Sequence, residues 1–459
     1  MAAPHASLHD VVQRLLSPEL DVAVQDFRGK RVFVRADLNV PLAREGGRTR
    51  VADRERIDAA LPTLRQLVAG GARAVVASHL GRPEPGKEPE DEMRRRDSLR
   101  PVADVLATEL GDAFAGMADD CAGPSAAALV ARLRDGQARV QPGLHAAAAC
   151  AALLCADLSR HAPQVGLLEN TRFEKGDTKD DAALAQAFAT LCDAYVLDGF
   201  GVCHRAQASV SGISRFVARR FPGPLVRREL QYLGAALDAP VRPFGVVLGG
   251  MKVRDKIGVL WALIKKADVI MIGGKMAFTF LAARGIAVGA TQIEADFVDD
   301  ARKMEAAAAA AGVKLLLPAD VVVSASPDEP RELRTVALRA GCCTSEAPCL
   351  PPGLFGMDIG PEAAHEFSCA IETCKTVLWN GPMGKFEVPA FGEGTQQIMR
   401  ALAETHRGGA ITVAAGGDSV SALNAAGLHG AMTHVSTGGG ASLQLLEGES
   451  MPGLEALLH

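Results

Sequence analysis

Two lysines one helical turn apart follow a glycine pair near the middle of the chain. Residues 244–248 form a short apolar run that predicts a buried strand, and Gly249-Gly250 ends it. Helical spacing follows, with Lys252 and Lys256 on one face and apolar residues on another. Glycine turns and helix N-termini attract negative charge through backbone N–H groups. The stretch therefore predicts an anion site, most simply for phosphate, although by itself it fits a surface lysine pair equally well.

The first half of the chain repeats one pattern, in which a predicted strand runs into polar residues. The strands are residues 31–36, 72–77, 165–168 and 194–197, and helical segments such as 54–67 and 99–110 alternate with them. This alternation is typical of a parallel sheet with helices on both faces, whose ligands bind beyond the carboxyl ends of the strands. The residues expected there are mostly cationic: Arg56, His79, Arg82, Arg172 and Arg205. One such residue could be a solvated charge, but five at one edge predict an anionic ligand.

The second half repeats the pattern with glycines and small polar groups at the strand ends. Its predicted strands are residues 268–272, 313–317, 376–378 and 411–414. Gly416-Gly417 before a helix suits phosphate, and Asp418 could hold Mg²⁺ together with phosphate oxygens. For any single glycine pair, a tight turn between strand and helix is the simpler interpretation. Residues 324–352 are expected to form a surface loop, and 436–442 a glycine-rich loop before an amphipathic tail.

Length and composition limit the classes of protein. A chain of 459 residues is too long for one ordinary core, so two domains are expected, with residues 225–237 as a helical connector. Residues 113–163 are alanine-rich, and much of this region is expected to form an inserted or lengthened helical segment without chemistry. The net charge of −5 gives no general attraction to nucleic acid, and no apolar run reaches transmembrane length. Ten scattered cysteines without a CxxC pair favour reduced thiols over zinc, so we expect a soluble cytoplasmic protein.

Two common nucleotide-binding patterns are missing from the sequence. No Walker A motif is present, and no G-x-G-x-x-G follows the first strand of either half. What remains is one domain with a basic anion pocket and another with a glycine-lined, nucleotide-like site. Phosphoryl transfer between two separately bound anions fits that division, because positioning and charge neutralisation supply most of its catalysis.

Nine motifs in a fixed order give the chain a specific resemblance. They are GKRVFVRADLNVP, SHLGRP, LLENTRF, GFGVCHRA, LGGMKVRDKI, MAFTFL, WNGPMG, GGDS and HVSTGGGASL. From about residue 29 to 454, the chain resembles the phosphoglycerate kinase family. The resemblance implies an α/β fold of two doubly wound parallel-sheet (Rossmann-like) domains joined by a hinge helix. Residues 1–238 would bind the triose acid and 239–440 the nucleotide, with a tail, 441–459, packing back on the first domain.

The resemblance also implies an activity. This is the reversible, Mg²⁺-dependent transfer of a phosphoryl group between ATP and 3-phosphoglycerate, which yields ADP and 1,3-bisphosphoglycerate. It implies a monomer that acts on small molecules, without a nucleic-acid or membrane partner.

Matching positions imply the site residues. The residues implied to hold the triose acid are Asp37, Asn39, Arg56, His79, Arg82, Arg172 and Arg205. The implied catalytic set is Arg56, Lys252, Gly416 and Gly439, in which Lys252 accompanies the transferring group. Asp418 matches the Mg²⁺ ligand. The implied nucleotide-binding residues are Gly250, Lys252, Lys256, Gly274, Gly356, Asn380, Glu387, Gly416, Gly417, Asp418 and Ser419.

Some positions depart from the family pattern. Beside the triose site, Leu197 stands where Asn is usual and Gly199 where Ala is usual, and Ala415 replaces a glycine of a GGGD run. Around the adenine pocket, the replacements of small or apolar residues are Met251, Lys275 and Lys385.

These departures leave three hypotheses about function. The first is an active kinase, the second a non-catalytic relative that binds a phosphorylated acid, and the third the same reaction with another nucleotide preference. We expect the two lysines to occlude the adenine pocket partly and to weaken adenine nucleotide binding. Alternatively, their ammonium groups point outward and leave the pocket open, or one of them donates to a base carbonyl and favours guanine.

Overall fold

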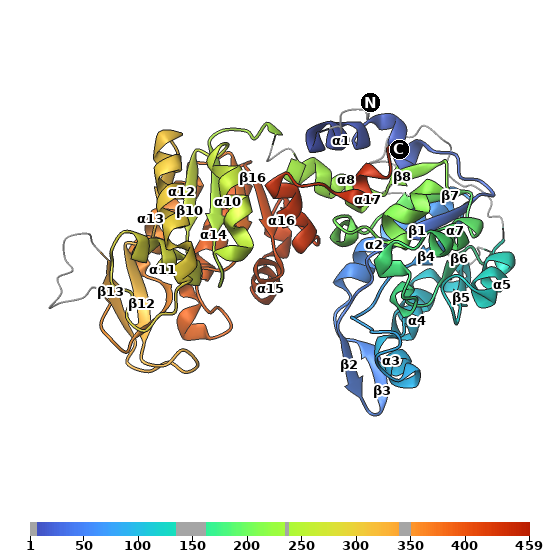
Figure 1. Cartoon of the computed structure of the whole chain (residues 1–459), viewed down its shortest axis with the longest axis horizontal. Coiled ribbons are helices and arrows are strands. Elements are labelled where there is room, and N and C mark those ends of the chain that lie inside the picture. The colour runs from blue at the N-terminus through green and yellow to red at the C-terminus, as the bar shows by residue number, and fades with distance from the viewer. Residues whose placement is uncertain (1–6, 135–161, 235–237, 339–349) are drawn as a thin grey trace. The chain divides into compact units, whose positions relative to one another are not determined.

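The computed structural model describes residues 7–134, 162–234, 238–338 and 350–459, and the chain divides into two compact units (Figure 1). Unit 1 comprises the chain up to Gln231 together with Ser450–His459. Unit 2 comprises Tyr232–Glu449. The C-terminal residues from Ser450 therefore belong to the same unit as the first half of the chain.

Unit 1 is built on a six-stranded parallel sheet. In spatial order its strands are β5 (Phe114–Met117), β6 (Val165–Leu167), β4 (Arg73–Ala77), β1 (Arg31–Arg35), β7 (Ala194–Leu197) and β8 (Arg220–Pro222). The four strands expected from the sequence all form. A two-stranded hairpin, β2 (Leu42–Glu45) and β3 (Arg48–Val51), projects from this unit (Figure 1).

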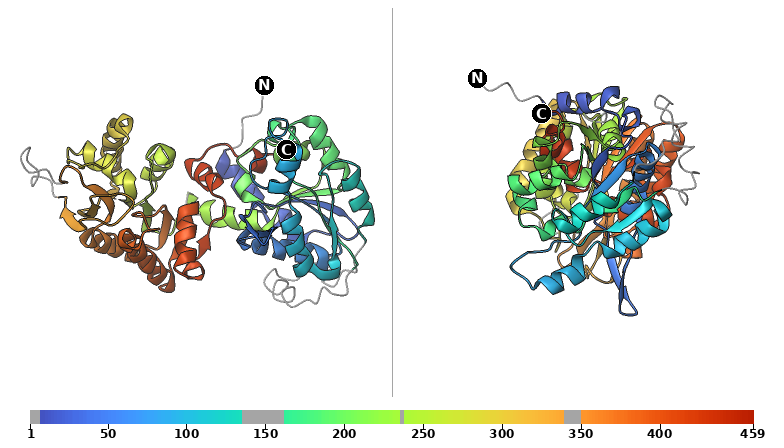
Figure 2. Two further views of the ribbon diagram at one scale, coloured as in Figure 1. Left: turned by 90° about the horizontal axis from the view of Figure 1, so that it is seen from below. Right: turned by 90° about the vertical axis from the view of Figure 1, so that its right-hand side faces the viewer.

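Helices cover both faces of this sheet (Figure 2). Side chains alternate along β1, so that Val32 and Val34 join the core formed with α2 (Glu55–Ala69) and α4 (Arg100–Leu110). Phe33 points to the opposite face, where its ring lies 5.5 Å from that of Phe188 on α7 (Ala182–Thr190). The fully buried strands explain the continuous apolar runs of the sequence.

Much of the alanine-rich region was expected to form a helical insertion, and its described part contains both a strand and a helix. Residues 114–117 form β5, an edge strand of the main sheet, and α5 (Pro124–Arg132) follows. Phe114 and Met117 lie against the core of the unit, so this segment contributes to packing. The part of the prediction that covers residues 135–161 lies outside the described residues.

A helix at each end of the chain completes unit 1. Helix α1 (Leu8–Leu15) begins at a capping box, in which Ser7 and Asp10 bind each other's backbone N–H, and it contacts α17 (Pro452–Glu455). At its C-terminus, the Arg227 guanidinium donates to the carbonyls of Leu15, Leu16 and Ser17 at 2.6–3.1 Å. Arg227 lies on α8 (Pro224–Glu229), so one side chain joins two helices that are far apart in sequence.

Unit 2 contains a second six-stranded parallel sheet. In spatial order its strands are β11 (Lys314–Leu316), β10 (Val269–Ile272), β9 (Phe244–Leu248), β15 (Thr376–Asn380), β16 (Ile411–Ala415) and β17 (His434–Val435). Helices α13 (Pro361–Glu372) and α14 (Glu393–Arg407) share one core with the sheet. The remaining long helices of this unit are α10 (Ile257–Ile264), α11 (Gly274–Ala283), α12 (Val298–Ala310), α15 (Gly417–Ala425) and α16 (Gly440–Glu447). With two parallel-sheet units, the predicted α/β class is confirmed.

Two local predictions in unit 2 are wrong. Lys252 does not lie on the helix after β9, because α10 begins only at Ile257, after a short 3₁₀ turn at Arg254–Lys256. Residues 324–352 are not simply a loop, because β13 (Arg334–Ala337) lies within them. It pairs with β12 (Asp320–Ser324), which pairs with β14 (Phe355–Ile359), and the three form a small antiparallel sheet.

The segment expected to connect the halves is helical as far as it is described. Helix α8 is followed by a π-helical turn at Leu230–Gly234, and the boundary between the units falls within that turn. Residues 235–237 lie outside the described residues. Over the part of the chain that the structure describes, every helix is too short or too polar to span a bilayer.

Replacing Arg227 with methionine should loosen α1. Three charge-assisted hydrogen bonds are lost from a side chain that is 16% exposed, which costs about 2 kcal/mol. Hydrogen exchange of the α1 amides should become faster by about tenfold or more. The exposed neighbour Arg228 gives the control variant, Arg228→Met, and equal exchange in the two variants would contradict the proposed role of Arg227.

Candidate active site

A cluster of positive charge surrounds a buried histidine at the carboxyl edge of the unit 1 sheet. His79 follows β4 and is 4% exposed. Arg35, at the end of β1, donates to its Nδ1 at 3.5 Å. Burial, together with the charges of Arg35, Arg172, Arg205 and Arg56, holds the pKa of His79 well below its ordinary value. His79 is therefore neutral at physiological pH, and an Nδ1 that accepts a hydrogen bond agrees with that state.

Arg172 and Arg205 also lie in this cluster, and nearby carboxylates neutralise their positive charges only in part. The Arg172 guanidinium donates to the Gly81 carbonyl at 2.7 Å, and its Nε is buried without a hydrogen-bond partner. Burial and the charges of Arg205 and Arg35 lower the pKa of Arg172 to about 10. Burial and the charge of Arg82 lower the pKa of Arg205 as well. Positive groups that depress one another's pKa in this way form a site that an anion would stabilise.

Asp37 and Asn39 follow β1 at the same edge. The Asp37 carboxylate accepts from Arg56 at 2.8 Å, across a half-buried ion pair. Asn39 accepts from the backbone N–H of Gly81 at 2.8 Å, which fixes the loop after β4. The sequence-predicted residues of the triose-acid set therefore gather on one edge of one unit, with Arg82 exposed at its margin.

Sequence reasoning missed Arg35, which is fully buried at the centre of this cluster. Its guanidinium donates to Ser209 Oγ at 2.9 Å and to the Ala36 carbonyl at 2.5 Å, besides its contact with His79. The available signal was an arginine at the carboxyl end of an otherwise apolar strand, where a charge is costly to bury unless it is bonded.

Of the departures beside this edge, Gly199 has a clear structural role. A Cβ at Gly199 would lie 3.0 Å from the backbone of Ala36 and Asp37, so glycine lets the two strand ends approach closely. Leu197 is fully buried in β7, paired with Arg35 of β1.

Three glycine turns meet at the carboxyl edge of the unit 2 sheet. Gly250, Gly274 and Gly381 all have positive φ, at 101°, 63° and 98°. A Cβ on Gly274 would lie 2.4 Å from the Gly250 nitrogen, and one on Gly381 would lie 2.4 Å from the Gly249 oxygen. Side chains at these positions would force the turns apart, so the glycines are required by close backbone approach.

Lys256 and Lys252 differ in their surroundings. Lys256 is 9% exposed, and its ammonium donates to the carbonyls of Gly249 at 2.5 Å and Asn380 at 2.7 Å. Burial lowers its pKa to about 8, against the opposing effect of Asp418. Lys252 is exposed in the loop before α10. The Glu294 carboxylate, a residue not singled out from the sequence, accepts from the backbone N–H of Val253 and so holds this loop.

The end of β16 brings a carboxylate to the same edge. Gly416 has φ 90°, and α15 begins at Gly417, with Asp418 exposed in its first turn. Ser419 is buried and accepts from the Gly381 N–H at 2.6 Å. The Asn380 side chain faces Gly416, with a Nδ2 that is buried without a hydrogen-bond partner. Gly439, with φ 53°, precedes α16.

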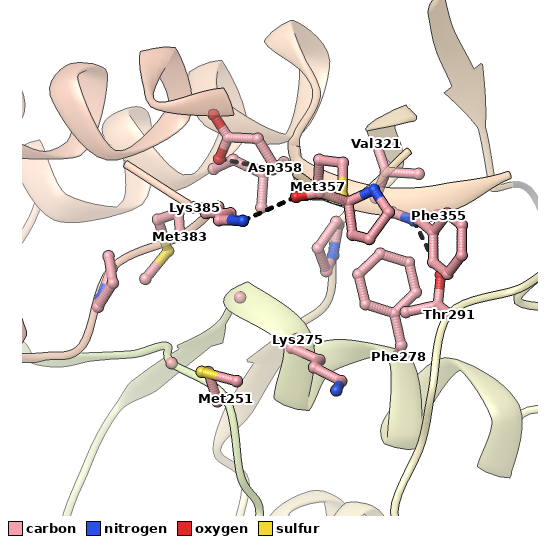
Figure 3. A pocket seen from close by; sticks show the side chains of 18 of the residues that line it. Met251, Lys275, Phe278, Thr291, Val321, Phe355, Met357, Asp358, Met383 and Lys385 are labelled. Carbon is pink, nitrogen blue, oxygen red and sulfur yellow. Dashed lines mark hydrogen bonds between the residues drawn. The ribbon is translucent and has the colours of Figure 1, made fainter. Parts of the chain in front are cut away.

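An open pocket of about 370 Å³ lies beside these turns (Figure 3). Gly250, Gly274, Glu387 and Asp418 are among the residues that line it. Its wall includes the Phe278 ring, which lies on Gly356, where a Cβ would be 1.9 Å from the ring. The volume is in the range of small-molecule sites, and the apolar wall suits a flat ring.

Met251, Lys275 and Lys385 line this pocket without filling it. Figure 3 places Lys385 on the side opposite Phe278 and Phe355, with Met251 and Lys275 below the cavity. The Lys275 ammonium contacts Gln292 Oε1 at 3.4 Å, and that of Lys385 donates to the Pro327 carbonyl at 2.8 Å. The expected partial occlusion is therefore not what the structure has, and the alternative of outward-pointing ammonium groups describes it.

Asp418 is the carboxylate at this edge that could hold a metal ion. Among the described residues, no three His, Cys, Asp or Glu side chains are arranged around a common metal position. A single carboxylate fits Mg²⁺, which is commonly bound through one or two carboxylates together with substrate phosphates and water.

Comparison with known proteins gives the family. A model of the phosphoglycerate kinase family matches residues 22–141 and 150–449. The chain belongs to the phosphoglycerate kinase family. This confirms the predicted family and the predicted class of enzyme, a phosphotransferase, over the non-catalytic alternative.

Individual relatives agree with this assignment. The chain is 43% identical to a phosphoglycerate kinase of Synechococcus sp. (strain JA-3-3Ab), over 94% of this chain and 96% of the relative. It is 44% identical to the chloroplastic phosphoglycerate kinase of Volvox carteri, over 97% and 87% of the two chains. Among solved structures, the phosphoglycerate kinase of Coxiella burnetii superposes with a TM-score of 0.77 at 33% identity, covering 96% of this chain and 98% of that one.

The buried position of Lys256 predicts a pH dependence of nucleotide binding. Below its pKa of about 8 the ammonium is charged and favours a phosphate, and above it the charge is lost. The affinity for ADP should therefore fall as pH rises from about 7.5 to about 9.5, by up to about tenfold per pH unit. Calorimetric titration across this range measures it.

A Lys256→Arg variant provides the control for this titration. Arginine stays charged over the whole range, so its pH profile should be nearly flat. Parallel profiles for the parent and the variant would show that Lys256 does not cause the pH dependence.

Proposed function

We propose that this protein catalyses reversible phosphoryl transfer between ATP and 3-phosphoglycerate, giving ADP and 1,3-bisphosphoglycerate. The observation that carries the proposal is the cationic cluster around the neutral His79, where Arg172 retains a buried Nε without a partner. A small molecule with a phosphate and a carboxylate supplies the negative charge that this edge lacks. Family membership supports the same substrates, because the relatives are named for them.

In unit 1, we assign binding of the acid to the arginines around His79. Guanidinium groups suit phosphate and carboxylate because they donate two parallel hydrogen bonds. Arg56 is the residue we assign to the transferring group. Its guanidinium donates to Asp37 from a side chain that is 34% exposed, so it can turn from Asp37 to a more highly charged ligand.

In unit 2, we assign the base to the apolar pocket and the phosphates to the glycine edge. The assigned base site and the assigned metal ligand adjoin, because Phe278 and Asp418 line the same cavity. Asp418 is the residue that would hold Mg²⁺, which supplies neutralisation of phosphate charge when bound. Lys252 is exposed in its loop, and we assign it to the transferring phosphoryl group, whereas the ammonium of Lys256 is held by two backbone carbonyls.

The reaction requires little covalent chemistry from the protein. A carboxylate oxygen of 3-phosphoglycerate attacks the γ-phosphorus, the bond from that phosphorus to the ADP oxygen breaks, and the electron pair leaves with ADP. Catalysis then consists of alignment and charge neutralisation, which arginine, lysine and a glycine-rich edge provide. A protein that only bound the acid would have no use for Asp418 at a nucleotide pocket.

The finer predictions of a monomer and a cytoplasmic location rest on the sequence alone. One relative, that of Volvox carteri, carries the name chloroplastic.

Replacing Arg56 with methionine tests the assignment of the catalytic arginine. We expect kcat to fall by roughly 10³-fold or more, with the affinity for ADP unchanged, because Arg56 acts in the unit that does not hold the nucleotide. The measurement is a coupled assay with ATP, 3-phosphoglycerate and Mg²⁺.

Arg54→Met is the matched control for Arg56→Met. Arg54 is exposed and is bonded to Asp58 and Glu109, so its loss should leave kcat near the parent value. An Arg56 variant that raises only the KM for 3-phosphoglycerate would show that Arg56 binds substrate without acting in the transition state. A folded parent protein without turnover on any nucleoside triphosphate would refute the proposed function.

A further inference from the structure

Lys385 bridges two walls of the nucleotide pocket. It lies in the loop after β15, and its ammonium donates to the Pro327 carbonyl at 2.8 Å and to Asp328 Oδ1 at 3.1 Å. Pro327 and Asp328 lie in the turn that follows β12. Lys385 and Pro327 both line the pocket, so this contact joins two parts of its wall.

The two ends of the bridge are anchored differently. The backbone N–H of Lys385 donates to the Met357 carbonyl at 3.1 Å, and its carbonyl accepts from Val388 at 3.0 Å. The turn of residues 325–331 is held internally by Ser324, whose Oγ contacts Glu329 and Arg331. Among the described residues, the hydrogen bonds from this turn to the opposite side of the pocket come from Lys385. The backbone of Lys385 is therefore anchored independently of the turn of residues 325–331, and its side chain holds that turn in place.

The carbonyl bond is the stronger part of the bridge. The side chain of Asp328 is 84% exposed and that of Lys385 is 40% exposed, so their ion pair is screened by water and contributes little. The bond to Pro327 is charge-assisted and fixes a residue of the pocket wall directly. Lys385 lines the pocket while its ammonium is bonded to the Pro327 carbonyl, so its aliphatic stem can serve as apolar surface.

We infer that Lys385 is a positioning residue for the nucleotide, which holds the Pro327 turn against the base pocket. This inference rests on the proposed function, because it takes the pocket to bind a nucleoside diphosphate. Without the bridge, the turn has to be ordered when the nucleotide binds, and that ordering weakens affinity. Affinity for the nucleotide should depend on Lys385, whereas the chemical step and the binding of 3-phosphoglycerate should not.

Lys275 provides the matched control. It is a lysine of the same pocket, but its ammonium makes one long contact of 3.4 Å, with the exposed Gln292. Removal of the Lys275 ammonium therefore loses one long contact with an exposed side chain, whereas removal of the Lys385 ammonium loses a hydrogen bond to the backbone of the pocket wall.

The experiment compares Lys385→Met, Lys385→Arg and Lys275→Met with the parent, after circular dichroism has shown that each variant is folded. Calorimetry gives the Kd for ADP, and steady-state kinetics give kcat and both KM values. We expect Lys385→Met to raise Kd and KM for the nucleotide by about threefold to tenfold, with kcat and the KM for 3-phosphoglycerate unchanged. Lys385→Arg keeps a cationic donor and should stay within about twofold of the parent, as should Lys275→Met.

The outcomes separate this inference from the proposed function. If Lys385→Met binds ADP as tightly as the parent or more tightly, the inference is overturned, whatever the activity. An equal loss of ADP affinity in Lys275→Met and Lys385→Met would also overturn the inference, because the contact of Lys385 with Pro327 would then have no specific effect. If the parent binds ADP and only Lys385→Met weakens that binding, the inference stands even where no turnover is found, and the proposed function alone fails.

Discussion

Positive charge that nearby carboxylates neutralise only in part is the constraint on which unit 1 depends. Arg35 is fully buried, and its hydrogen bonds to Ser209 and the Ala36 carbonyl keep it beside His79. Burial and the charges of Arg205 and Arg35 lower the pKa of Arg172, and burial and the charge of Arg82 lower that of Arg205. The folded chain therefore stores electrostatic repulsion at this edge. A parallel sheet tolerates the repulsion because its strands are fixed by burial on both faces. An anionic substrate would reduce the repulsion among these arginines, and this reduction would contribute to its binding free energy.

Unit 2 has the same parallel-sheet architecture, but its carboxyl edge is formed mainly by glycine turns. Its strand ends meet so closely that only glycine fits at Gly274 and Gly381, and the backbone itself becomes the surface of the site. The buried Lys256 there is bonded to two backbone carbonyls, and its pKa is lowered by burial. The adjoining pocket is largely apolar, with Phe278 against Gly356. A concentrated positive edge suits a small acid that carries both a phosphate and a carboxylate, whereas a glycine edge beside an apolar pocket suits phosphates attached to a flat base.

Much of this arrangement could be predicted from the sequence, because parallel strands bring their carboxyl ends to one edge. The polar residues after residues 31–36 and 72–77 placed Asp37 and His79 at one edge of the sheet, where they lie after β1 and β4. The start of α10 could not be placed, because Lys252 and Lys256 keep helical spacing although the chain between them is a loop and a 3₁₀ turn. Arg35 was overlooked because an arginine within an apolar run is read as a strand end, and its buried partner Ser209 lies far away in sequence.

The pocket lysines show a further limit of sequence reasoning. From the sequence, two ammonium groups replacing small residues were expected to crowd the base pocket. Their acceptors, Gln292 for Lys275 and the Pro327 carbonyl for Lys385, lie in loops whose positions no local pattern specifies. A backbone carbonyl is an acceptor at every residue, so the sequence carries no signal for the Lys385 contact.

Binding of 3-phosphoglycerate to the nucleotide-free protein tests the central claim that unit 1 is a site of uncompensated positive charge. Calorimetric titration at about 20 mM and about 200 mM salt should show clear binding that weakens as salt screens the exposed part of the cluster. An Arg172→Met variant should bind about tenfold or more weakly than the parent at either salt concentration. Binding that is absent in the folded parent, or that is unchanged both by salt and by loss of Arg172, would contradict this account.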